Sequence, residues 1–394
     1  MTETSGPQAL PRALAVNRTA FAYRYDVPFI LVVAALLGIG LVMVASASTS
    51  IAARSYGDPL AYFWRQSMHV AVAIAALGVA VRCPTRLWER IGPALMVVAV
   101  VLLALVLVPG IGREVNGSTR WLGLGWFNLQ PSELAKLFFV IYLAGDVVRR
   151  EEKIRDARFG VIKPLAVLVV VSLLLFLEPD HGAIFVLSAT VFAMLFLAGV
   201  PMARYAALAG TAAVALVGAV LLHKEYVINR LTSFMDPFAD PFGTGFQLTQ
   251  SLIAIGRGGW FGVGLGEGVQ KLFYLPEAHT DFLFAVLAEE FGLIGTLTIV
   301  GLYTFIVLRS LSIGRHAEAT QSWFSAYAAY GIGLLLGVHA FVNIGVNIGI
   351  LPTKGLTLPL MSYGGSNLVT SAVCIGILLR IDHERRVARC GAES

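Results

Sequence analysis

Long apolar runs separated by short polar segments are the feature that most constrains the fold of this chain. A helix needs roughly 20 apolar residues to cross a hydrocarbon layer about 30 Å thick, and most of the runs reach that length. The expected fold class is therefore an all-α polytopic membrane protein. We predict ten membrane-spanning helices, at residues 28–47, 67–82, 91–109, 132–148, 164–178, 182–199, 205–222, 282–308, 324–347 and 363–380.

The composition excludes a soluble protein of this size. Only 13% of the 394 residues are charged, while 57% are hydrophobic and the mean hydropathy is +0.77. A soluble domain carries roughly 25% charged residues, which cover its surface. Most side chains of this chain must therefore face lipid or one another.

The basic residues indicate how the helices are oriented. With the N-terminus in the cytoplasm, most of the 29 Lys and Arg residues fall in short segments on that side, as the positive-inside rule expects. An even number of spans then places both termini in the cytoplasm. Because the basic residues are dispersed over these segments, a nucleic-acid-binding patch is not expected. We predict a cytoplasmic tail at 1–27, a transmembrane domain at 28–381 and a cytoplasmic tail at 382–394.

Polar and aromatic residues gather in three segments on the predicted outer side, 110–131, 223–281 and 348–362. The middle segment is a long outer loop rich in Gly, Pro and Phe. Loops of such length are usually functional or disordered, and the apolar content argues against disorder. Residues 247–256 are apolar at helical spacing, which predicts a short helix at the membrane interface.

Ionisable residues within the spans are candidates for function because they are costly to bury in a membrane. Glu133 and Lys136 are three residues apart and share a helix face. They form either a structural ion pair or a site in which Lys136 presents a cation to an anionic substrate. Glu289 and Glu290 point to different faces of the eighth span, so at most one can face a shared cavity. Each is slightly better explained as a carboxylate that packs against a neighbouring helix.

Two outer positions also allow two interpretations each. Arg120, beside Trp121 and Trp126, is either an aromatic-belt anchor or a guanidinium that holds phosphate at the membrane surface. Asp281 falls where the eighth helix begins, so it could act as an N-cap. A carboxylate fixed at this boundary, with Glu277 and His279 nearby, could also accept a proton from a sugar hydroxyl. Capping and catalysis do not exclude one another.

Six strings in order along the chain resemble the SEDS (shape, elongation, division, sporulation) family of membrane glycosyltransferases. The resemblance covers nearly the whole chain. Residues 352–357 are similar to the division-associated branch rather than the elongation branch, although Asn367 stands where the familiar ending has Ser. The six strings are Gly117–Trp121, Gln130–Lys136, Phe234–Pro241, Ile255–Gly266, Gln270–Phe284 and Asn343–Gly365.

This resemblance implies a bacterial inner-membrane enzyme, enriched at the division septum, that polymerises lipid II into β-1,4-linked glycan strands. It implies as partners an FtsI-like class B penicillin-binding transpeptidase and other membrane proteins of the division machinery. The family's key loop carboxylate falls on Asp281, the expected catalytic residue. No metal-ligand cluster stands out, and the need for a divalent cation is left open. The candidate substrate-binding residues are Arg120, Trp121, Lys136, Glu133, His279, Glu277 and Glu289.

The residues also suit this chemistry. Lipid II carries an α-linked sugar on a pyrophosphate, so one displacement that forms a β bond needs a base for the attacking hydroxyl. The pyrophosphate leaves as an anion and needs cations rather than a second carboxylic acid, unlike glycoside hydrolysis. A flippase for the lipid-linked precursor, or a scaffold for division proteins, is the alternative. A transporter needs polar residues on both sides, whereas here they cluster on one side.

A partner helix in the membrane would pack against small or apolar residues. We therefore expect the transpeptidase to contact the eighth and ninth spans. The small residues on these spans are Gly292, Gly295, Gly331, Gly333 and Gly337.

Overall fold

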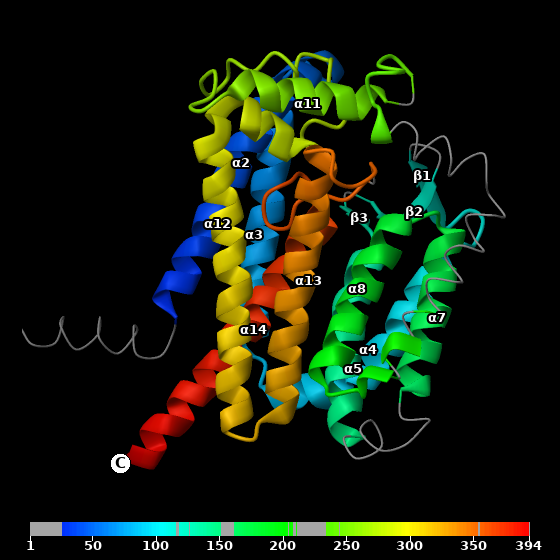
Figure 1. Ribbon diagram of the computed structural model, residues 1–394, viewed down its shortest axis with the longest axis vertical. Helices are drawn as coiled ribbons and strands as arrows, with labels where there is room; N and C mark the ends of the chain where they lie inside the picture. The colour runs from blue at the N-terminus through cyan, green and yellow to red at the C-terminus, as the bar shows by residue number, and fades with distance from the viewer. Residues whose placement is uncertain are drawn as a thin grey trace, which may run out of the picture.

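The computed structural model describes residues 26–115, 118–125, 127–150, 161–203, 205–207, 210, 234–243, 245–353 and 355–393. Within these residues, long helices form a bundle with short strands and one crosswise helix at one end (Figure 1). Most of the predicted span at 205–222 and most of the predicted tail at 1–27 lie outside the described residues. The bundle helices, each matching one predicted span, are α2 (Val27–Tyr56), α3 (Ala61–Arg82), α4 (Thr85–Val106), α5 (Pro131–Arg149), α7 (Ile162–Leu177), α8 (His181–Leu197), α12 (Leu283–Ala319), α13 (Trp323–Asn347) and α14 (Gly365–Glu393).

Six described helices are long and apolar enough to cross a membrane: α2, α3, α4, α12, α13 and α14. Helices α7 and α8 are shorter apolar helices, and α5 carries four charged residues along its length. The mostly helical, polytopic architecture is thus confirmed, whereas the number of ten spans and the position of both termini stay predictions. Helix α14 continues through residues 382–393, so the predicted C-terminal tail extends the last span.

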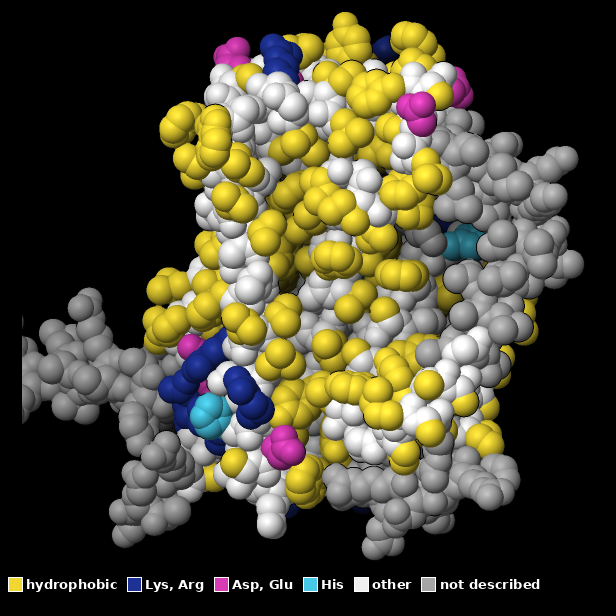
Figure 2. All heavy atoms as spheres, in the orientation of Figure 1, with side chains coloured by type: hydrophobic (Ala, Val, Ile, Leu, Met, Phe, Trp, Pro, Cys, Tyr) yellow, Lys and Arg dark blue, Asp and Glu magenta, His cyan; other side chains and the backbone are white. Residues whose placement is uncertain are grey.

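Helices α5, α13 and α14 are the most deeply buried helices of the bundle. The apolar stretch of α14 is 83% buried and that of α13 is 67% buried, compared with 17% for α3 and 22% for α12. Outer helices leave large apolar side chains such as Leu31, Val97 and Leu297 exposed. Figure 2 shows hydrophobic side chains along the face of the bundle, as expected for helices surrounded by lipid.

One end of the bundle carries the segments predicted to face outward. Strands β1 (Gly112–Val115), β2 (Ser118–Leu124) and β3 (Phe127–Leu129) form an antiparallel sheet in the order β1-β2-β3. The all-α expectation did not include this small sheet. Helix α11 (Phe246–Gly258) lies across the same end (Figure 1), which confirms the short helix predicted at 247–256.

Helix α12 is interrupted at Gly292, and the long outer loop packs against this break. This residue has φ 64° and ψ −160°, so the regular helical hydrogen bonds cannot continue through it. Loop residues 259–264 supply the missing partners, which explains how the membrane-spanning helix tolerates the break. A Cβ at Gly292 would lie 2.4 Å from the Gly262 nitrogen, so no larger residue fits. The four hydrogen bonds run from Leu293 N to Gly259 O (2.9 Å), Ile294 N to Trp260 O (3.2 Å), Val263 N to Glu289 O (3.0 Å) and Gly264 N to Glu290 O (3.1 Å).

The predicted orientation can be tested by cysteine labelling. Phe242 in the long outer loop is 88% exposed, so a Phe242→Cys protein should react with a membrane-impermeant thiol reagent in intact spheroplasts. Glu89→Cys, near the start of α4 at the other end of the bundle, should react only after the membrane is permeabilised. Labelling of residue 242 only from the inside would contradict the predicted topology.

Candidate active site

Asp281 lies in the turn that ends the long outer loop. Helix α12 begins at Leu283, its N-cap is Phe282, and no side chain caps it. The alternative interpretation of Asp281 as the N-cap is therefore wrong: the helix begins two residues after Asp281.

The backbone of Asp281 is held by two asparagine side chains of α13. The Asp281 carbonyl accepts hydrogen bonds from Nδ2 of Asn343 (2.9 Å) and of Asn347 (3.0 Å). The last outer loop passes close to the carboxylate, because a Cβ at Gly355 would lie 3.1 Å from Asp281 Oδ2. The side chain is thus set in position by the bundle and by the loop that follows α13.

The charge state of Asp281 is tuned by its surroundings. Desolvation by the surrounding protein raises the pKa of Asp281 to about 7, and the negative charges of Glu277 and Asp180 act in the same direction. Arg120 opposes them by stabilising the carboxylate. A pKa near neutral pH suits a general base, which must be ionised and yet able to hold a proton.

Arg120 extends from β2 toward the connection between α7 and α8. Its Nε donates to the Glu178 carbonyl (3.2 Å) and its Nη2 donates to the Pro179 carbonyl (2.5 Å). Both acceptors are neutral, so these bonds orient the guanidinium without cancelling its charge. Trp121, the next residue in β2, is half-buried and pairs with Arg113 across the sheet.

Lys136 and Glu133 form a buried ion pair in the first turns of α5. Their side chains are 2.9 Å apart and only 2% and 6% exposed. Lys136 Nζ also lies 3.5 Å from Nδ1 of His339 in α13. The contact expected of a structural ion pair is present, while the role of Lys136 toward a substrate stays a prediction.

His279 and Glu277 are held within the turn before Asp281. The buried His279 ring packs on Tyr62 (4.6 Å between ring centroids) and Tyr363 (5.5 Å), and burial lowers the pKa of His279. The imidazole is therefore neutral at neutral pH. Glu277 has a positive φ of 55°, and its carboxylate accepts a hydrogen bond from the Thr280 hydroxyl (2.7 Å).

Glu289 contacts the outer loop rather than the residues around Asp281. Its carboxylate accepts hydrogen bonds from the backbone of Val269 (2.9 Å) and Gln270 (3.2 Å) and lies 3.3 Å from Arg257. Glu290 pairs with Lys271 (2.5 Å) and accepts from Ser46 of α2 (2.7 Å). Glu289 therefore holds the loop on α12, and its assignment to the substrate site stays a prediction.

A family model described as a cell cycle protein and covering FtsW, RodA and SpoVE matches residues 27–387. The chain belongs to the FtsW/RodA/SpoVE family. It is 54% identical over 363 residues to the probable peptidoglycan glycosyltransferase FtsW of Thioalkalivibrio sulfidiphilus, which covers 92% of this chain and 90% of that protein. It is 51% identical over 362 residues to the protein of the same description from Legionella pneumophila, which covers 92% of each.

Solved structures of family members have the same fold. A structure described as the coordination of polymerization and crosslinking by a peptidoglycan synthase complex matches with a TM-score of 0.76 and 29% identity, covering 92% of this chain and 98% of that one. Thermus thermophilus RodA, a rod shape determining protein, matches with a TM-score of 0.67 and 29% identity, covering 92% and 97%.

Sequence reasoning missed Asp180, which the fold of this family member places beside the site. The 2% exposed carboxylate caps α8 by accepting from Ala183 N (3.0 Å). It also accepts from the Ser132 hydroxyl (2.9 Å) and the Gln130 amide (3.4 Å) at the start of α5. A signal was available, because Asp180 precedes an apolar run at its outer end as a helix-capping residue would.

Glu178 is a second acidic residue that sequence reasoning missed. Its side chain is fully buried, and neither carboxylate oxygen has a hydrogen-bond partner among the described residues. Burial, followed by the charge of Asp180, raises the pKa of Glu178 to about 8. At neutral pH it is therefore mainly protonated, so it adds little charge beside Arg120.

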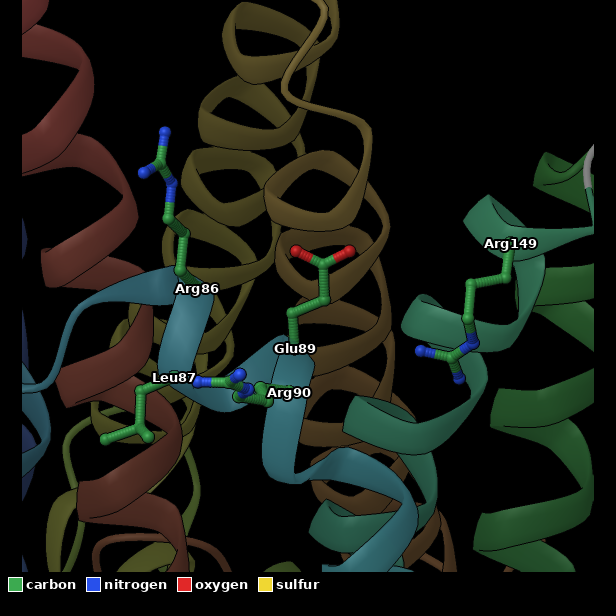
Figure 3. A pocket seen from close by; sticks show the side chains of 5 residues that line it. All are labelled: Arg86, Leu87, Glu89, Arg90 and Arg149. Atoms are coloured by element: carbon green, nitrogen blue, oxygen red, sulfur yellow. The ribbon is translucent and has the colours of Figure 1, made fainter.

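The described residues hold no group of three or more His, Cys, Asp or Glu side chains arranged for a metal ion. A divalent cation in this family member stays an open prediction. A cavity of about 630 Å³ lies at the other end of the bundle, lined by Arg86, Leu87, Glu89, Arg90 and Arg149 (Figure 3). These residues belong to the ends of α4 and α5 far from Asp281, so the cavity is not part of the candidate active site.

Proposed function

We propose that this protein is the peptidoglycan glycosyltransferase of the division branch, and that it polymerises lipid II into β-1,4-linked glycan strands at the outer face of the bacterial inner membrane. The observation that carries the proposal is Asp281, a positioned carboxylate whose pKa is about 7 and which lies within electrostatic reach of Arg120. The relatives described as FtsW glycosyltransferases support the same activity, and their name supports a place at the division septum.

The reaction follows from the residues present. Asp281 accepts the proton of the 4-hydroxyl of the acceptor sugar as the oxygen attacks the anomeric carbon of the donor sugar. The attack inverts that carbon and breaks its bond to the lipid pyrophosphate, which leaves with both electrons of the bond. Arg120, oriented by two carbonyls, stabilises the departing negative charge. Lys136 supplies a second cation one turn into α5.

The complex described for the matching peptidoglycan synthase supports a partner that crosslinks the strands, which we propose to be a class B penicillin-binding transpeptidase. Four of the five glycines expected to contact it pack against other parts of the chain. A Cβ at Gly331 would lie 2.6 Å from Met194, at Gly333 2.6 Å from Ser310 and at Gly337 2.7 Å from Val307. Gly292 forms the break in α12 and packs against the outer loop. The exposed Leu293, Ile294 and Leu297 of α12 are the better candidates on these two spans.

The pH dependence of the rate should report Asp281. Because the base must be ionised, the rate should fall about tenfold for each pH unit below a midpoint near 7. Arg120→Ala removes a charge that lowers the pKa, so the midpoint should move to higher pH. Glu277→Gln removes a charge that raises it, so the midpoint should move to lower pH. Rates of lipid II polymerisation by purified variants measure both shifts, and identical midpoints in the two variants would contradict this assignment.

The proposed activity itself is tested with purified lipid II. The protein in detergent or liposomes, with and without its cognate transpeptidase, should convert lipid II into glycan polymers that a muramidase digests. Fluorescent lipid II in liposomes distinguishes the flippase alternative. Translocation across the bilayer without any polymer, in the presence of the transpeptidase, would refute the proposed reaction.

A further inference from the structure

The proposed reaction needs two separate places for phosphate. Both substrates are lipid-linked sugars, and each carries its own pyrophosphate. The pyrophosphate of the donor is attached to the carbon under attack, so its cations must lie beside Asp281, as Arg120 does. The acceptor reacts through the hydroxyl at the opposite end of its disaccharide. Its pyrophosphate must therefore lie about one disaccharide length from Asp281, where Arg120 cannot serve it.

Another cation, Arg65, lies in the second turn of α3, on a different element from the strand β2 that carries Arg120. The exposed Arg65 donates from Nη1 to the Tyr56 hydroxyl (2.9 Å), and its guanidinium carbon lies 4.3 Å from the centre of the Tyr56 ring. Arg65 also interacts with the hydroxyl of Tyr363. These neutral hydroxyls orient the guanidinium and leave its charge available.

An aromatic cluster connects Arg65 to the turn that carries Asp281. The Tyr62 ring lies 5.0 Å from the Tyr363 ring and 4.6 Å from the His279 ring, measured between centroids. The backbone nitrogen of Tyr363 donates to the carbonyl of His279 (3.0 Å). The cluster thus extends from an exposed arginine to a residue two positions before Asp281. Aromatic faces of this kind can pack on the apolar faces of sugars.

Two other described cations near this end of the bundle are held in ion pairs. Lys271 pairs with Glu290 and Arg257 pairs with Glu289, whereas none of the ion pairs within the described part of the chain includes Arg65. Trp64 is 62% exposed beside Arg65, as expected at the boundary between lipid and water. A phosphate attached to a lipid would reach Arg65 at this depth.

We infer that Arg65, together with Tyr56 and Tyr363, binds the pyrophosphate of the acceptor substrate, and that Tyr62 and Tyr363 guide its disaccharide toward Asp281. This inference rests on the proposed glycosyltransferase function. It assigns the two lipid-linked substrates to opposite sides of the catalytic turn, the donor on the Arg120 side and the acceptor on the Arg65 side.

The experiment separates the two substrates with a lipid II analogue that lacks the 4-hydroxyl of its terminal sugar and can act only as donor. Labelled analogue is held at fixed concentration while lipid II is titrated as acceptor. Arg65→Ala should raise the lipid II concentration for half-maximal coupling by about 10- to 100-fold, the effect of losing a charge-assisted hydrogen bond. The concentration of the analogue that gives half-maximal coupling, measured in a separate titration with lipid II held fixed, should be unchanged, and Arg65→Lys should recover part of the loss.

Two variants serve as controls. Arg54→Ala removes another outer arginine, one that lies over the Phe273 ring at 5.4 Å, and its titration should match the wild type. Arg120→Ala should show the opposite pattern, with a higher concentration of the donor-only analogue needed for half-maximal coupling. Repeating the titration in nanodiscs with and without anionic phospholipid tests whether Arg65 binds an ordinary headgroup phosphate instead. An Arg65→Ala effect that follows phosphatidylglycerol content rather than lipid II concentration would overturn the inference.

The remaining outcomes are also decisive. If the wild type couples the two substrates and Arg65→Ala gives the same titration curve, the inference is wrong and the proposed function stands. If Arg65→Ala raises the half-maximal concentration of the analogue as donor as much as that of lipid II, the assignment to the acceptor is wrong. If the wild type does not couple the analogue to lipid II, with or without the transpeptidase, both the proposed function and this inference are wrong.

Discussion

Replacing Asp281 with asparagine should lower the rate of lipid II polymerisation about 10²- to 10⁴-fold, because an amide cannot accept the proton of the attacking hydroxyl. The substitution hardly changes the shape of the side chain. The hydrogen bonds from Asn343 and Asn347 end on the Asp281 carbonyl, so they remain in place. Asp281 does not cap α12, so no helix cap is lost.

The stability of the same variant provides an independent check. The folded protein raises the pKa of Asp281 from 3.8 to about 7, so the ionised carboxylate disfavours folding as the pH rises through that interval. Asp281→Asn removes this effect and should leave the melting temperature at pH 8 unchanged or higher. A rate near that of the wild type would end the catalytic assignment. Glu277 would then be the next candidate, since the Glu289 carboxylate is already bound to the outer loop.

Breaking the Glu133–Lys136 pair should have the second largest effect. Lys136→Met leaves a buried carboxylate without its cation, which costs about 3–5 kcal/mol of folding free energy. We expect a clear drop in melting temperature together with loss of polymerisation. This single variant cannot separate a structural role of Lys136 from a role in binding the substrate, because both predict lost activity.

The double variant Glu133→Gln/Lys136→Met separates the two roles. It removes both charges at once, so most of the melting temperature should return. If Lys136 also presents its cation to pyrophosphate, polymerisation should stay low in the double variant. The matched control is the Glu290–Lys271 pair, which is equally buried but holds the outer loop. There Glu290→Gln/Lys271→Met should recover stability and activity together. Recovery of both in the Glu133/Lys136 double variant would exclude a substrate role for Lys136.

The spans and the Glu133–Lys136 pair could be predicted from sequence because they depend on local geometry. A helix of given length either crosses the hydrocarbon layer or does not, so apolar runs predict spans. Residues three apart on a helix share a face whatever surrounds them, and the two charges of this pair do meet at 2.9 Å. The short apolar stretch at 247–256 is likewise a helix, α11, for a reason contained in its own spacing.

Other features were decided only by the tertiary structure, since they depend on residues far apart in the chain. From sequence spacing alone, Asp281 could be either a helix N-cap or a general base. The fold begins α12 at Leu283, which removes the first alternative, and burial raises the pKa of Asp281. The sequence alone did not show that Glu289 binds the outer loop. In the folded chain its carboxylate accepts hydrogen bonds from the backbone of residues 269–270. The break at Gly292 forms because loop residues 259–264 satisfy the backbone groups it leaves open. Helix periodicity determines which residues share a face of one helix. The energy of a buried charge or of an unpaired backbone group depends instead on partners that are distant in the sequence, and only the folded chain brings these partners together.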